Sequence, residues 1–71
     1  MDNAKLIRMA NQIAANLASR GETAAIADTA EHIRKFWDPR MKAAIFAEDP
    51  AQLSPIARAA IEKLKTETAA V

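Results

Sequence analysis

Three prolines divide the second half of the chain, and each one follows a residue that caps helices well. The pairs are Asp38 with Pro39, Asp49 with Pro50, and Ser54 with Pro55. Asp and Ser side chains accept hydrogen bonds from free N–H groups at a helix start, and Pro suits the first helical position because its missing N–H is not needed there. A residue before Pro is also kept out of the helical region. We therefore predict helices beginning at Pro39 and Pro55, and a single turn at Pro50.

The first half of the chain predicts two longer helices. Alanine is very frequent, Gly21 is the only glycine, and no stretch alternates with period two, so we expect helices and no strand. The first helix is expected over residues 3–20, with Asp2 or Asn3 as its N-cap and Gly21 in the left-handed conformation at its end. The second helix is expected over residues 23–37.

Apolar residues at spacings of three and four predict one buried face for each helix. In the first helix they are Leu6, Met9, Ile13 and Leu17. In the second helix they are Ile26, Ala30, Ile33 and Trp37, with Phe36 at the edge. The third helix carries Met41, Ala44 and Ile45. The fourth buries Leu53, Ile56, Ala60, Ile61 and Leu64. The predicted fold class is all-α, a small bundle of three to four helices in one domain over residues 1–71, with a frayed end at "TETAAV".

Size and cysteine content limit what can hold such a domain together. A chain of 71 residues is one domain at most and buries only roughly 60% of its unfolded surface. Domains this small usually depend on disulfides, a metal, a partner or very regular helices. The sequence has no cysteine and one histidine, which removes disulfides and thiolate metal sites and makes a structural zinc unusual. Of the four means of stabilising a small domain, a partner or very regular helices remain for this chain.

The charge balance argues against nucleic acid and membranes as partners. Ten basic and nine acidic residues give a formal net charge of +1, which creates no strong field. No apolar run approaches the roughly 18 residues of a membrane span. The start, "MDNAKLIRMA", carries an early acid and lacks the apolar segment of a signal peptide. We expect a soluble, cytoplasmic protein.

Catalytic chemistry is not expected in this chain. His32 is the only obvious general base, and neither Ser19 nor Ser54 lies in a nucleophile signature. No glycine-rich loop or phosphate-binding motif is present. We predict no catalytic residue, no bound cofactor, no metal and no small-molecule substrate, and we interpret His32 as a structural or interface residue.

One local basic cluster lies beside Trp37. It comprises His32, Arg34, Lys35, Arg40 and Lys42. Acidic residues are interspersed with it at Asp28, Glu31 and Asp38, whereas proteins that bind DNA are usually far more basic. DNA binding is therefore not the function we expect first, and a free-standing helical DNA-binding or regulatory protein is the alternative.

The stretch "HIRKFWDPRM" concentrates large side chains at the corner between the second and third helices. Trp37 either packs in the core or faces a partner, since both places suit an aromatic ring. Arg40 is the second residue of its predicted helix, where the helix dipole disfavours a positive charge. It either pairs with Asp38 or a nearby Glu, or it meets a carboxylate or carbonyl group of another chain. Trp and Arg are the residues most enriched at interface hot spots.

Asn11 and Gln12 form a second feature, two amides in an alanine-rich helix. They lie off the face made by Leu6, Met9 and Ile13. They are either solvated or part of an interface, because they can contact a partner at no cost to the core.

Two blocks and a weaker tail segment resemble a known family. "KLIRMANQIA" (5–14), "HIRKFWDPRM" (32–41) and "LSPIARAA" (53–60) resemble the delta subunit of NAD-dependent, molybdenum-containing formate dehydrogenases. The family pattern falls on Met9, Ala10, Asn11, Gln12 and Ile13, and then on His32, Phe36, Trp37, Asp38, Pro39, Arg40 and Met41. One departure is Asn16 and Leu17, where aromatic residues often follow the first block, so the packing of the first helix is expected to differ.

The resemblance implies a non-catalytic subunit of a cytoplasmic complex that oxidises formate and reduces NAD. The molybdopterin, the iron–sulfur clusters, the FMN and the NAD site of that complex would belong to other subunits, and the delta subunit would support assembly, stability or cofactor insertion. The expected partner is the large catalytic subunit. We predict that Trp37 and Arg40 anchor this partner and that His32 and Asp38 fix their setting. Further candidates for the interface are Phe36, Asn11 and Gln12.

Overall fold

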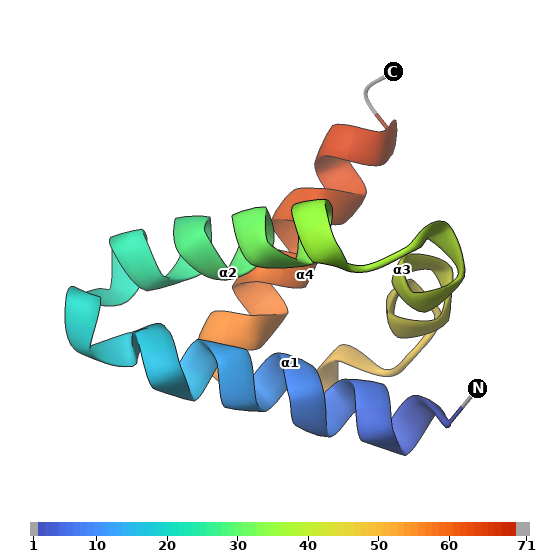
Figure 1. Cartoon of the computed structure of the whole chain (residues 1–71), viewed down its shortest axis with the longest axis horizontal. Helices are drawn as coiled ribbons and strands as arrows, with labels where there is room; N and C mark the ends of the chain where they lie inside the picture. Colours follow the sequence, from blue (N-terminus) through green and yellow to red (C-terminus); the bar gives the residue numbers. More distant parts are fainter. Residues whose placement is uncertain (1, 70–71) are drawn as a thin grey trace.

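The computed structural model describes residues 2–69, and every regular element in that range is helical. Helices α1 and α2 run side by side in opposite directions, α4 crosses them, and the short α3 lies at the end where α1 begins (Figure 1). The predicted all-α fold is confirmed. The elements in chain order are α1 (Asn3–Leu17), the 3₁₀ turn η1 (Ala18–Arg20), α2 (Glu22–Phe36), α3 (Pro39–Phe46), the 3₁₀ turn η2 (Pro50–Gln52) and α4 (Pro55–Ala69).

The capping residues begin their helices as the sequence predicts. Helix α1 begins after Asp2, whose Oδ1 accepts the N–H of Ala4 at 3.0 Å. The other three caps are Asp38, Asp49 and Ser54, which accept a backbone N–H at 2.8, 2.9 and 3.4 Å. Each such bond satisfies a donor that the first turn of a helix leaves free. The predicted starts at Pro39 and Pro55 and the single turn at Pro50 are confirmed.

Small residues occupy much of the core. The buried apolar residues are Leu6, Ile7, Ala10, Ala14, Ala25, Ala30, Ile33, Trp37, Ile45, Leu53, Ala57, Ala60, Ile61 and Leu64. Six of these are alanines, and helices that meet through alanines approach closely because no long side chain separates their backbones. Several predicted core positions lie instead at its margin, half-buried: Ile26, Met41, Ala44 and Ile56.

The buried face of α1 differs from the predicted one. Of the four residues in the predicted stripe, only Leu6 is buried, while Met9, Ile13 and Leu17 are half-buried. The buried positions beside Leu6 are Ile7, Ala10 and Ala14. The prediction is centred on the largest apolar side chains, whereas the closest contact runs along the alanines next to them.

The turn between α1 and α2 uses the one glycine of the chain. Gly21 has φ of +97° and ψ of 152°, so its φ is positive as predicted, but its ψ is extended and not left-handed helical. Side chains with a Cβ rarely adopt this conformation. The last turn of the predicted first helix tightens into η1 before Gly21, and α2 begins and ends one residue earlier than predicted.

Helix α4 continues into the end of the chain that the sequence predicts to be frayed. Residues 66–69, the first four of "TETAAV", continue the helix, while Ala70 and Val71 lie outside the described residues. The guanidinium of Arg34 in α2 donates to both carboxylate oxygens of Glu67 at 2.7 Å. This bidentate contact ties the last turns of α4 to α2. The sequence predicts fraying here because it shows no sign of a contact over such a separation.

Candidate partner interface

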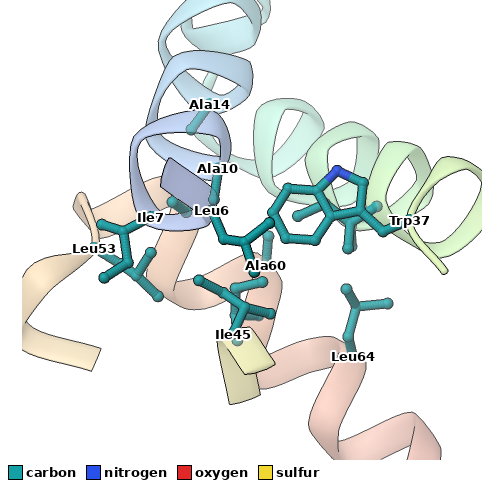
Figure 2. Close-up of a cluster of buried hydrophobic side chains, with 13 residues drawn as sticks. Leu6, Ile7, Ala10, Ala14, Trp37, Ile45, Leu53, Ala60 and Leu64 are labelled. Atoms are coloured by element: carbon teal, nitrogen blue, oxygen red, sulfur yellow. The ribbon is translucent and has the colours of Figure 1, made fainter. Parts of the chain in front are cut away.

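Trp37 is a core residue and not an exposed anchor. It ends α2 as the C-cap with an extended backbone, φ of −91° and ψ of 135°, and its exposed fraction is 5%. The ring reaches from the end of α2 toward Leu6 and Ala10 of α1 (Figure 2). Burial inside one chain leaves the ring little surface for another chain. Of the two interpretations of Trp37, the structure supports the core.

The exposed aromatic of the corner is Phe36, the neighbour of Trp37. Phe36 is 71% exposed, and it is the one large hydrophobic residue so exposed in the described part of the chain. The ring of His32, one helical turn earlier, lies against it with 4.9 Å between ring centroids and a 45° angle between planes. His32 and Phe36 thus form an exposed aromatic pair on α2, which we call the aromatic pair.

Arg40 is exposed in the first turn of α3, beside the aromatic pair in sequence. Among residues 2–69 its side chain makes no ion pair and no hydrogen bond, so the predicted alternative of a pair with Asp38 or a nearby Glu is not present. The Asp38 carboxylate instead caps α3 through the N–H of Met41 at 2.8 Å. A positive charge here is disfavoured by the dipole of its own helix. The fold therefore makes no polar use of the Arg40 side chain within the described residues.

The other basic residues on either side of the corner are bound within the chain. Arg34 pairs with Glu31 and Glu67, and Lys35 pairs with Glu31 at 3.3 Å. The hydrogen bond with Glu67 raises the pKa of Arg34, helped by the charges of both carboxylates, so its guanidinium stays charged. The ammonium of Lys42 donates to the carbonyl of Arg34 at 2.8 Å, at the end of α2 where helix carbonyls lack partners. Among these arginines and lysines, Arg40 alone has no polar partner within residues 2–69.

Asn11 has partners inside the chain. Its Oδ1 accepts the N–H of Ser54 at 2.8 Å, and its Nδ2 donates to the carbonyl of Gln52 at 3.3 Å. The amide therefore fastens α1 to the segment that leads into α4. Gln12 is exposed and donates to Asn16 at 3.0 Å, one turn along the same helix. Interface roles for both residues stay predictions, and Gln12 is the more accessible of the two.

A groove that the sequence did not reveal lies between the first turns of α1 and α3. It has a volume of ≈ 440 Å³. The lining residues are Asp2, Lys5, Leu6, Met9, Asp38 and Met41. We call it the methionine groove. Two helix starts that lie far apart in the sequence form its walls, so no local pattern could have indicated it.

No group of three or more His, Asp or Glu side chains within residues 2–69 is arranged to hold a metal ion. None of the helices in this part of the chain is both long and apolar enough to cross a membrane.

Comparison with known proteins assigns the chain to a family of formate dehydrogenase subunits. A model of the family described as NADH-dependent formate dehydrogenase delta subunit FdsD matches residues 5–61, which is most of the chain. The chain belongs to this family. Neither the comparison with curated proteins nor the comparison with solved structures gives a match. The matched range contains the aromatic pair, Arg40 and most of the methionine groove.

Proposed function

We propose that this protein is a non-catalytic subunit of a cytoplasmic formate dehydrogenase complex, which it supports in assembly, stability or cofactor insertion. Membership of the delta subunit family carries this proposal, because it implies association with the other subunits of such an enzyme. In this proposal the molybdopterin, iron–sulfur clusters, FMN and NAD site belong to those other subunits. The contribution of this chain is protein–protein contact.

The contact surface that we propose is the corner between α2 and α3. Phe36 is largely exposed, although an aromatic ring gains free energy when it leaves water. Arg40 lacks a partner among the described residues and is disfavoured by its helix dipole, so a carboxylate or carbonyl group of another chain would compensate it. His32 lies against Phe36 and extends the aromatic surface. Asp38 sets the direction of α3 as its cap.

This proposal modifies the sequence-based prediction at one residue. The sequence predicts that Trp37 anchors the partner together with Arg40, but the Trp37 ring is buried in the core. We therefore assign the anchoring role to Phe36 and Arg40, and we assign Trp37 the role of fixing the corner that presents them. The proposed partner remains the large catalytic subunit.

The first test is co-purification of the tagged chain from its native host, followed by identification of the large molybdenum-containing subunit. Its recovery in a stoichiometric complex is the expected result. Recovery without any formate dehydrogenase subunit, from cells that produce the enzyme, would contradict the proposal.

The second test concerns Arg40→Ala. Association with the large subunit should weaken by about 2 kcal/mol, or roughly 30-fold, as for hot-spot residues. Thermal stability of the free chain should be nearly unchanged, because the substitution removes a charge that the α3 dipole disfavours. Lys63→Ala, an exposed change on α4, is the matched control and should bind normally. A large loss of stability with normal binding would show that Arg40 stabilises the fold of this chain and is not part of the interface.

A further inference from the structure

The methionine groove has an apolar floor that suits one long side chain from another molecule. Leu6 is buried beneath it, and Met9 and Met41 are half-buried and pack against the core. Thioether side chains are unbranched and adaptable, and they are frequent at surfaces that accept an apolar group. Its volume of ≈ 440 Å³ provides space for a large aliphatic or aromatic side chain.

The groove lies where the two sequence blocks that carry the family resemblance meet. Met9 comes from the first block, and Asp38 and Met41 come from the second. Helix α3 and the start of α1 lie at the same end of the molecule (Figure 1). Arg40 does not line the groove, but it belongs to the same first turn of α3 as the lining residue Met41.

The charges around the groove favour an anionic neighbour for that side chain. The carboxylates of Asp2 and Asp38 cap helices, so the positive ends of α1 and α3 compensate them. Lys5 on the groove wall and Arg40, which lies in the first turn of α3 but does not line the groove, have no side-chain partner within residues 2–69. Both lie in the first turn of a helix, where its dipole disfavours them. The charged side chains of this region that lack a compensating group are therefore the two cations.

We propose that the methionine groove receives a long apolar side chain from a segment of the partner that also carries a carboxylate next to it. The apolar side chain contacts Met9 and Met41, and the carboxylate meets Lys5 and Arg40. This inference rests on the proposed function in one respect, since the segment belongs to the large catalytic subunit. It goes further by naming the chemistry of the segment and the cations that select it.

The test uses a charge reversal that has opposite effects on folding and binding. In the double variant Lys5→Glu/Arg40→Glu, both new carboxylates lie in first helical turns, and the one introduced at position 5 would complete a capping box with Asp2. The free chain should melt at the same temperature as the wild type or higher. Affinity for purified formate dehydrogenase that lacks this subunit should fall by at least about 30-fold at about 0.15 M salt, where the Debye length is about 8 Å.

The matched control is Lys63→Glu/Lys65→Glu on α4, which changes the net charge by the same amount away from the groove. It should bind within about threefold of the wild type, because surface charges farther away than a Debye length are screened. If both double variants lose affinity equally, the loss is explained by net charge alone, and the proposal is overturned.

A second pair of variants tests the floor of the groove. Met41→Gln keeps the length of the side chain but makes it polar, and it should weaken binding by about tenfold. Met41→Leu keeps the apolar volume and should bind within about threefold. Both are compared at a temperature where circular dichroism shows each chain to be folded. Equal affinity of Met41→Gln and wild type would overturn the groove as the binding site.

The outcomes separate this proposal from the proposed function. If the wild type binds the enzyme and the Lys5, Arg40 and Met41 variants bind equally well, the groove proposal is wrong and the subunit role stands. If the wild type does not bind the enzyme at all, the proposed function fails, and the groove proposal fails with it.

Discussion

The middle of α2 and the corner at its carboxyl end contrast in what surrounds each side chain. In the middle, Ala25, Thr29 and Ile33 are fully buried against neighbouring helices. At the corner, Phe36 is 71% exposed and Arg40 has no partner within residues 2–69. The middle of α2 therefore belongs to the core, whereas its carboxyl end begins an exposed surface whose side chains contribute little to the fold. Unused side chains of these types are what an interface requires.

Two adjacent aromatics divide these tasks between them. The extended backbone of Trp37 turns its ring into the core, while Phe36 is the last helical residue and faces solvent with His32. The chain changes direction at Trp37 and Asp38, before α3 begins. Because a core ring fixes the corner, the exposed pair and Arg40 are held in a defined position. Preorganised surfaces lose less conformational entropy on binding.

The largest expected effect comes from Trp37→Ala. Truncating a buried ring removes its transfer free energy and leaves a cavity, so the free energy of unfolding should fall by about 3–5 kcal/mol. In a domain this small, such a loss is a large part of the total stability. Urea denaturation followed by circular dichroism measures it.

Phe36→Ala is the matched control, one residue away. It should change the free energy of unfolding by no more than about 0.5 kcal/mol, because surface substitutions rarely do more. It should instead weaken association with the formate dehydrogenase. If both variants destabilise the free chain equally, the distinction between core and surface aromatics at this corner is lost.

The proline pairs made much of the fold predictable. Capping is a local interaction between a side chain and an N–H two or three residues away, so Asp38 and Ser54 reveal helix starts in the sequence itself. Arg40 is exposed and unpaired within residues 2–69, which agrees with the interpretation that it meets a group of another chain. Its unfavourable position in the helix dipole can also be recognised from the local sequence.

The features that the sequence did not reveal depend on contacts between residues that lie far apart in the chain. Ser54 lies 43 residues from Asn11, and Glu67 lies 33 residues from Arg34, so neither contact has a local signature. Alanine caused the error on the face of α1, since its small side chain is compatible with both surface and core. The sequence leaves Trp37 undecided because burial of a helix-ending residue depends on its backbone angles, which turn the ring toward α1.

The next effect in size is expected from Asn11→Ala. The substitution removes the acceptor for the partly buried N–H of Ser54 and the donor to the Gln52 carbonyl. Leaving such a group unsatisfied costs about 1–3 kcal/mol of stability. Thermal unfolding measures the loss, and amide hydrogen exchange should accelerate most at Ser54. Gln12→Ala, whose side chain bonds only within α1, is the control and should be close to neutral.

The last effect, expected to be smaller than those of Trp37→Ala and Asn11→Ala and opposite in sign, comes from Thr29→Val in the buried middle of α2. The Thr29 hydroxyl is fully buried and has no hydrogen-bond partner within the described residues. Valine has nearly the same shape without the polar atom, so the substitution removes a desolvation cost at little change in packing. We expect the free energy of unfolding to rise by about 1 kcal/mol, at the low end of the cost of a buried unsatisfied group. Thr23→Val, exposed in the first turn of the same helix, is the control for helix propensity. A clear loss of stability in Thr29→Val, relative to that control, would mean that the hydroxyl is satisfied in solution. The middle of α2 would then not be the purely close-packed seam that contrasts with the corner.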